Sequence, residues 1–176
     1  VIAYDRLGFG QSDPHRGPIG ADFIRQEAHT GFSALIDQFG VGRFIVFGHS
    51  VGGGMAVSIA AAYPDRCAGL ITESAQAFVE EQTRAGIRTA QAQFAEPGQM
   101  SRLERYHGDK APWVLDAWVS TWLSPAFADW CLDEDLLGVR CPVLAMHGTE
   151  DEYGSTAQPE RIVTLAGAPA RLALLQ

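Results

Sequence analysis

The pentapeptide Gly48-His49-Ser50-Val51-Gly52 constrains the fold of this chain more than any other segment. An apolar run at 44–47 precedes it and a helix-like run at 55–63 follows it, which predicts a strand, a tight turn and a helix. The run at 44–47 does not alternate with polar residues, as expected of a central parallel strand covered on both faces. A serine at the tip of such a turn is typical of a nucleophile, because the strained backbone projects its hydroxyl away from the sheet.

The neighbours of Ser50 fit this interpretation. Strand and helix crowd together beside the turn, and glycine at 48 and 52 would avoid a clash there. The Val51 backbone N–H begins the helix and could donate to a developing oxyanion. His49 lies on the same turn and should point away from the Ser50 hydroxyl, which favours a structural role. The alternative is a glycine-rich connection without chemistry.

Composition limits the possible functions. The chain has 176 residues, of which 47% are apolar, and a net charge of −8, which indicates one globular domain and argues against a nucleic-acid partner. No apolar stretch approaches the ~18 residues of a membrane span. Cys67, Cys131 and Cys141 lack C-x-x-C spacing, so we expect no metal site, free thiols and a cytoplasmic location. Cys67 and Cys141 each precede a predicted strand and could lie close together.

The order of elements predicts an α/β fold with a doubly wound, mostly parallel sheet. Strands are expected at 1–4, 44–47, 68–72, 142–146 and 171–175, and helices at 21–39, 55–63 and 158–166. Asp22 could cap the first helix. Ligands bind at the carboxyl ends of such strands, where Asp5, Ser50 and Glu73 are found. The loop after the first strand has Asp13 where a dinucleotide fingerprint needs glycine, so no nucleotide cofactor is expected.

Residues 75–137 interrupt the pattern of strands. Helices are predicted near 76–95, 99–107 and 112–124, in an insertion too long for an ordinary connection. We interpret 75–137 as a helical cap over the active edge of a core made of 1–74 and 138–176. Trp118 and Trp122 are one helical turn apart and should share a face. Together with His49 they are candidates for substrate contact; for the tryptophans the alternative is packing within the cap.

Three motifs in this order resemble the α/β-hydrolase superfamily, in its serine hydrolase branch. They are Asp5-Arg6-x-Gly8-x-Gly10-x-Ser12, Gly48-His49-Ser50-Val51-Gly52-Gly53 and His147-Gly148-x-x-Asp151. The resemblance implies that Ser50 is the nucleophile, Asp151 the acid, and the Val51 N–H half of the oxyanion hole. Glu150 and Glu73 are weaker candidates for the acid, and a turn-capping role is the alternative for Asp151. His147 is expected to pack structurally.

Two parts of that family's pattern are missing. The family places its base histidine after the acid, and no histidine follows Asp151. The five histidines are His15, His29, His49, His107 and His147. The first three strands are missing too, together with the loop that supplies the second oxyanion donor. We therefore expect an internal fragment of a longer protein, inactive and poorly folded alone, with exposed sheet edges.

For the intact protein, the resemblance implies a serine hydrolase that works through an acyl-enzyme. The expected substrate is a small to medium, partly apolar carboxylic ester or lactone, with no metal and no organic cofactor. A C–C bond hydrolase uses the same triad and is the near alternative. A non-catalytic ligand-binding member of the fold is the alternative from another class. The sequence leaves the oligomeric state open, and we expect no membrane partner.

Overall fold

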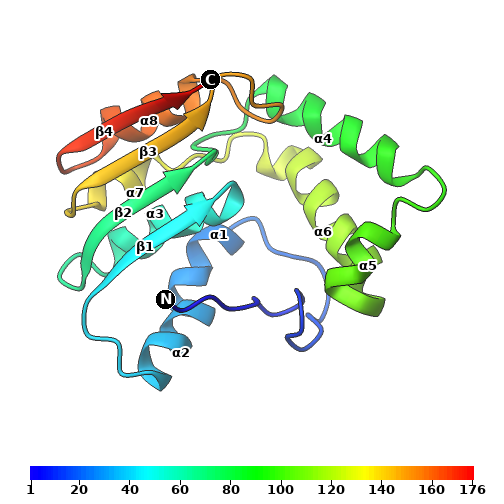
Figure 1. Cartoon of the computed structure of the whole chain (residues 1–176), viewed down its shortest axis with the longest axis horizontal. Coiled ribbons are helices and arrows are strands. Elements are labelled where there is room, and N and C mark those ends of the chain that lie inside the picture. Colours follow the sequence, from blue (N-terminus) through cyan, green and yellow to red (C-terminus); the bar gives the residue numbers. More distant parts are fainter.

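The computed structural model describes residues 1–176 and is built on one sheet of four strands (Figure 1). The strands follow one another in the sheet as they do in the chain: β1 (Phe44–His49), β2 (Cys67–Glu73), β3 (Val143–Gly148) and β4 (Ala170–Leu175). All three pairings are parallel, so each connection must cross back over the sheet. The predicted α/β class with a parallel sheet is confirmed.

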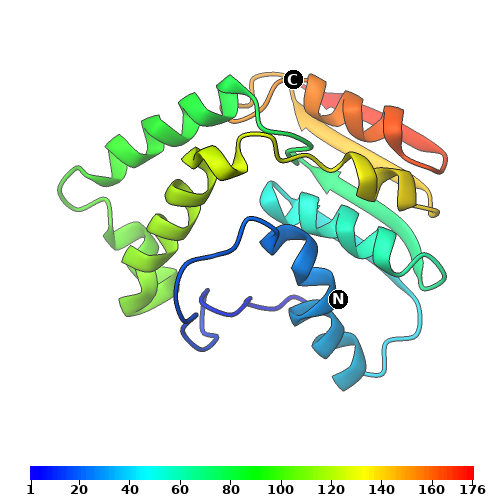
Figure 2. The same cartoon turned by 180° about the vertical axis from the view of Figure 1, so that it is seen from behind.

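Three helices cover one face of the sheet (Figure 2). They are α3 (Val51–Ala62), α7 (Asp133–Gly138) and α8 (Ala157–Leu165). The core lies between these helices and the sheet, where Val57 and Leu70 are 0% and 1% exposed. Helix α3 is buried along most of its length because it packs on β1 and β2 and also contacts α7. No helix in the structure combines the length and apolar composition needed to span a membrane.

The opposite face of the sheet is uncovered at β1. Burial alternates along this strand, and Ile45 and Phe47 are 66% and 57% exposed. β1 is also an edge strand, since β2 is its only partner. The expectation of a central strand covered on both faces is therefore wrong for 44–47. The physical reason is that no strand pairs with its outer edge, and Ile45 and Phe47 remain exposed on its free face.

The strand expected at 1–4 is also wrong. Val1–Tyr4 has no regular structure, because no strand lies beside it to pair with its backbone groups. Its polar contact comes from a side chain instead: the Tyr4 hydroxyl donates to Oε1 of Glu27 at 2.6 Å.

The single helix expected at 21–39 is broken. It forms α1 (Phe23–Gln26), a 3₁₀ turn (Glu27–His29) and α2 (Gly31–Gln38). Thr30 leaves the helical region with φ −117° and ψ −94°. A Cβ at Gly31 would lie 2.3 Å from the buried Glu27 carboxylate, so this close approach requires glycine. Asp22 does not cap α1; its carboxylate accepts from the Gln26 side chain.

Residues 75–137, between β2 and β3, form helices beyond the carboxyl ends of the strands (Figures 1 and 2). These are α4 (Glu81–Phe94), α5 (Ser101–His107) and α6 (Ala111–Leu123). Helix α4 starts five residues later than expected because Oε1 of Gln158 accepts from the Ala77 and Phe78 N–H groups, at 2.7 and 3.3 Å. The only strand-like pairing in this region is an isolated bridge between Phe78 and Cys131. Helix α7 was not predicted.

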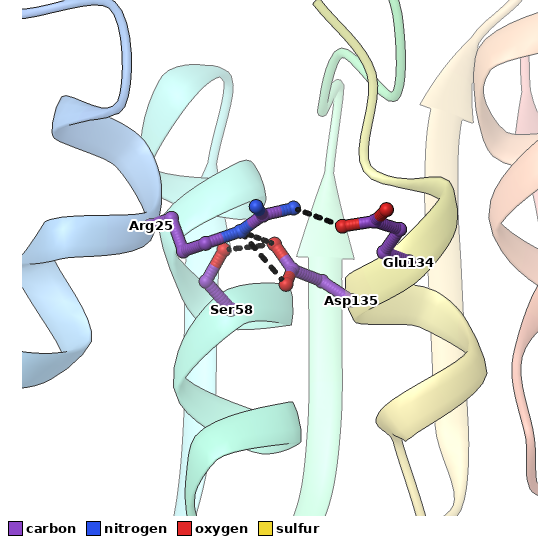
Figure 3. Close-up of polar contacts among 4 residues, drawn as sticks. All are labelled: Arg25, Ser58, Glu134 and Asp135. Atoms are coloured by element: carbon purple, nitrogen blue, oxygen red, sulfur yellow. Dashed lines mark hydrogen bonds and ion pairs between the residues drawn. The ribbon is translucent and has the colours of Figure 1, made fainter.

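Four side chains tie α1, α3 and α7 together (Figure 3). Arg25 Nε lies 3.1 Å from Asp135 Oδ1, and its Nη2 lies 3.4 Å from Glu134 Oε2. The buried Ser58 hydroxyl donates to Asp135 Oδ2 at 2.8 Å. A buried hydroxyl on α3 is thus satisfied by α7, which fixes how the two helices pack.

Cys67 and Cys141 lie together, as their places before neighbouring strands suggested. Their sulfur atoms are 3.5 Å apart and both residues are buried. Burial, followed by the neighbouring Cys67 thiol, raises the pKa of Cys141 to about 12. The Cys141 thiol therefore stays protonated and a poor nucleophile.

Candidate active site

Ser50 forms the turn between β1 and α3, with φ 52° and ψ −126°. A positive φ is uncommon for a residue with a side chain, and such strain concentrates at functional sites. Two backbone hydrogen bonds hold the conformation. The Ser50 N–H donates to the Glu73 carbonyl at 2.9 Å, and the Gly53 N–H donates to the Ser50 carbonyl at 2.8 Å. The turn is thereby fixed to both β2 and α3.

Two glycines allow this turn to close. A Cβ at Gly48 would lie 2.0 Å from the Gly52 carbonyl oxygen, and one at Gly53 would lie 2.4 Å from the Ala75 Cβ. A Cβ at Gly52 would meet nothing within 4 Å. Crowding at 48 is confirmed, whereas the expectation of crowding at 52 is wrong. The backbone of Gly52, rather than the space beside it, makes the close contact.

The Ser50 hydroxyl has one polar partner in the structure. Its Oγ donates to Oε1 of Gln76 at 3.4 Å, a long contact. Gln76 is 4% exposed, and its amide nitrogen lies 3.4 Å from the Ser74 carbonyl oxygen. None of the five histidines hydrogen-bonds Ser50. Gln76 was not predicted from the sequence, where its only signal is its place just after a strand that ends at the carboxyl edge of the sheet.

Asp151 follows β3 and is held by backbone groups. Its Oδ1 accepts from the N–H groups of Tyr153 and Gly154 at 2.8 and 3.0 Å. This oxygen makes the turn-capping contact considered above, while Oδ2 makes no hydrogen bond. His147 is 1% exposed, and its Nε2 lies 2.9 Å from the Gly154 carbonyl oxygen. His147 thus packs structurally, as expected, and supports the same loop.

The Asp151 loop is also tied to the start of α4. The Glu80 carboxylate accepts from the N–H and the hydroxyl of Ser155, at 2.8 and 2.9 Å. The Gln82 amide donates to the Asp151 carbonyl at 2.7 Å. These contacts join the insertion to the sheet edge, so the position of the carboxylate depends on both.

A pocket of about 390 Å³ brings the predicted site residues together. Those lining it are Ser50, Val51, Asp151, His49, Trp118 and Trp122. The weaker acid candidates, Glu73 and Glu150, do not line it. Much of the remaining wall is apolar and includes Phe9, Phe23, Ile87, Val114 and Leu115. A largely apolar cavity with a few polar groups is what a small-molecule site requires.

Trp118 and Trp122 of α6 share a face, as their spacing predicted, and both line the pocket. Trp122 is 3% exposed and packs edge-to-face on Phe127 and Trp130, with ring centroids 5.1 and 5.6 Å apart. The ring centroids of Trp118 and Tyr153 lie 6.0 Å apart. Trp122 therefore packs among aromatic rings and also lines the pocket.

Like Gln76, the polar lining residues Arg6, Thr83 and His107 were not predicted from the sequence. The Thr83 hydroxyl is buried and has no hydrogen-bond partner. Burial is the largest cause that lowers the pKa of Arg6 and of His107. Burial, then the Glu152 and Asp151 carboxylates, raises the pKa of Tyr153. In the sequence Arg6 is part of a loop motif with no sign of a pocket location, and His107 carries no signal because it lies far from Ser50 in the chain.

The sheet, the strained serine turn and the pocket at the carboxyl edge define a protein of the α/β-hydrolase kind. A family model described as alpha/beta hydrolase fold matches residues 1–121, and the chain belongs to that family.

Two curated relatives and one solved structure illustrate the similarity. Lipase LipV of Mycobacterium tuberculosis (strain ATCC 25618 / H37Rv) is 33% identical over 123 residues, which cover 66% of this chain and 45% of that protein. Putative carbamate hydrolase RutD of Caulobacter sp. (strain K31) is 26% identical over 182 residues, which cover 86% of this chain and 63% of that protein. The chain thus spans about half to two thirds of the length of these relatives. The 2-hydroxy-6-oxo-6-phenylhexa-2,4-dienoate hydrolase BphD from Rhodococcus sp. strain RHA1 has the same fold, with a TM-score of 0.74, 15% identity, and coverage of 96% of this chain and 69% of that one.

Proposed function

We propose that this protein is a serine hydrolase that cleaves a carboxylic ester or lactone through an acyl-enzyme. The observation that carries the proposal is Ser50, held at φ 52° between β1 and α3 and lining the same pocket as Asp151. A strained serine at a strand–helix turn, facing a largely apolar pocket, is suited to nucleophilic attack on a carbonyl. The family and its lipase relative support the same chemistry.

Each residue has a role in the proposed reaction. The Ser50 oxygen attacks the carbonyl carbon and gives its proton to a histidine, while the Val51 N–H donates to the oxyanion. The histidine returns the proton to the leaving alcohol, and the acyl group stays on Ser50. Water then attacks the ester carbonyl, releases the acid and restores the serine proton. Asp151, through its free Oδ2, would orient the histidine, which we place outside residues 1–176.

We propose that residues 75–137 act as a cap on the substrate pocket. Helices α4 to α6 lie beyond the carboxyl ends of the strands, and α6 brings Trp118 and Trp122 to the pocket wall. These rings favour a partly apolar acyl or alcohol group. We also propose a cytoplasmic location, since no cysteine motif requires an oxidising compartment.

The test uses the full-length protein, a fluorophosphonate probe and a panel of p-nitrophenyl esters and lactones. Ser50→Ala should abolish labelling and lower kcat/KM at least ~10³-fold. Ser33→Ala is the matched control, because the Ser33 hydroxyl makes no hydrogen bond and lies outside the pocket. Wild-type protein that is neither labelled nor active would support the non-catalytic alternative. Turnover restricted to a vinylogous diketone would support the C–C hydrolase instead.

A further inference from the structure

Arg6 places an unpaired cation in the substrate pocket. Its guanidinium carbon lies 4.3 Å from the centroid of the Phe9 ring and 5.9 Å from that of Phe23. The Arg6 side chain makes no hydrogen bond to any group of the chain, and it is in none of the ion pairs. A guanidinium has five N–H donors in a planar fork, and a half-buried one needs acceptors. The Phe9 and Phe23 rings attract the positive charge of the guanidinium, but they do not accept hydrogen bonds from all of its N–H groups.

Glu27 is the acid that influences Arg6, but it does not pair with it. The Glu27 carboxylate accepts from the Tyr4 hydroxyl at 2.6 Å and is not within 4.0 Å of the guanidinium nitrogens. Burial is the largest influence on the pKa of Glu27 and raises it, against the opposing effects of Tyr4 and Arg6. The donors of Arg6 therefore remain available to a ligand.

His107 supplies a second donor on the same pocket wall. Its Nδ1 accepts from the Gly10 N–H at 2.8 Å, so in the neutral ring the proton lies on Nε2. Burial, then the Lys110 charge, lowers the pKa of His107 against the opposing Asp5 carboxylate, which favours the neutral form. The His107 and Phe9 ring centroids are 6.1 Å apart, so Arg6 and His107 both contact Phe9.

We propose that Arg6, assisted by the Nε2–H of His107, forms an anion subsite that selects substrates carrying a carboxylate besides the scissile ester or lactone carbonyl. The proposal rests on the proposed function and names its substrate class. A carboxylate can take two parallel hydrogen bonds from a guanidinium, and these are stronger where water is excluded by an apolar wall. The subsite would orient the substrate, while Ser50 remains the reacting group.

The experiment compares two esters of similar size on the full-length protein. One is p-nitrophenyl butyrate, which is neutral, and the other is mono-p-nitrophenyl glutarate, which carries a carboxylate. For each protein we divide kcat/KM for the glutarate ester by kcat/KM for the butyrate ester. This ratio should be at least tenfold lower in Arg6→Gln than in the wild type, and Arg6→Lys should restore part of it. Arg16→Gln removes the same charge from an exposed residue outside the pocket and should leave the ratio unchanged. A ratio in Arg6→Gln within twofold of wild type would overturn the proposal.

A binding measurement separates this inference from the proposed function. Calorimetry should detect glutarate binding to the wild-type and Ser50→Ala proteins, and weaker binding to His107→Gln. If neither ester is hydrolysed but glutarate binds through Arg6, the proposed chemistry fails and the subsite stands. If the Arg6 variants do not fold, glutarate binding to the wild-type protein still tests the subsite. Absence of that binding overturns the subsite, whether or not the butyrate ester is hydrolysed.

Discussion

Ser50 owes its conformation to residues that lack side chains. A positive φ at a serine costs about 1–3 kcal/mol, which the surrounding structure must offset. The two backbone hydrogen bonds of Ser50 help to do so. One ties Ser50 to Glu73 on β2, and the other, from the Gly53 N–H, depends on the close approach of β1 to the first turn of α3. That approach exists because Gly48 leaves room for the Gly52 carbonyl. One missing Cβ therefore sets the position of the candidate nucleophile.

Two alanine substitutions beside the Ser50 turn should have opposite effects on stability. Gly48→Ala puts a Cβ 2.0 Å from a backbone oxygen and should lower the free energy of unfolding by about 3 kcal/mol. Gly52→Ala meets no atom within 4 Å, lies in a helix, and should be neutral or stabilising by up to about 1 kcal/mol. Urea denaturation of the full-length protein measures both. Equal urea midpoints for the two variants would contradict the close approach of Gly48 to the Gly52 carbonyl oxygen.

Helix α7 links three other helices although it has only six residues. Asp135 connects it to α1 and α3, and Asp133 connects it to α8 through Arg161 (Figure 3 shows the Asp135 contacts). Short helices form too few internal hydrogen bonds to be stable alone, so packing and these contacts hold α7 in place.

The Asp133–Arg161 pair should make stability depend on pH. The hydrogen bond from Arg161 is the first cause that lowers the pKa of Asp133. A carboxyl with a lowered folded-state pKa stabilises the protein above its unfolded pKa, and this contribution is lost as pH falls through the folded one. The pair is partly exposed, so Asp133→Asn should cost about 0.5–1 kcal/mol at neutral pH. Denaturation curves measured from roughly pH 7 to pH 3 should show that the difference in unfolding free energy between wild type and Asp133→Asn becomes smaller as the pH falls.

A double-mutant cycle is the control for this pair. Arg161→Gln should cost little in the Asp133→Asn background, since the interaction is already gone. Additive effects of the two substitutions at neutral pH would mean that the ion pair does not stabilise the fold.

At the scale of the whole molecule, the sheet is covered unequally. Helices pack on one face, while β1 leaves two large apolar side chains in solvent on the other. Uncovered apolar area and a free strand edge both favour association with other chains.

Residues 1–176 expressed alone should therefore self-associate. Sedimentation should show oligomers that increase with concentration, and the double variant Ile45→Ser/Phe47→Ser should shift the population toward monomer. Phe39→Ser is the matched control, because Phe39 is 62% exposed but lies outside the sheet. A monomer at every concentration would show that the free face does not drive association.

Local pattern predicted much of this architecture. The apolar runs at 44–47, 68–72, 142–146 and 171–175 all form strands, because short apolar runs bounded by turns carry their own signal. The serine turn was predictable for the same reason, since its glycines and flanking elements are contiguous in the chain. That Ser50 and Asp151, which follows a later strand, lie at the same edge of the sheet followed from the rule that parallel strands share one carboxyl edge.

Most features that depend on contacts between distant residues could not be predicted; the proximity of Cys67 and Cys141 is an exception, because each precedes one of two neighbouring strands. The sequence by itself determined the parallel α/β layers and the serine turn, because periodicity and turn chemistry act within a few residues. Only the tertiary structure decided that 1–4 is not a strand, that Gln158 delays α4, and that Arg6 and His107 meet at one pocket wall. Pairing, burial and unpaired donors depend on which segments lie side by side, and the local pattern does not carry that information.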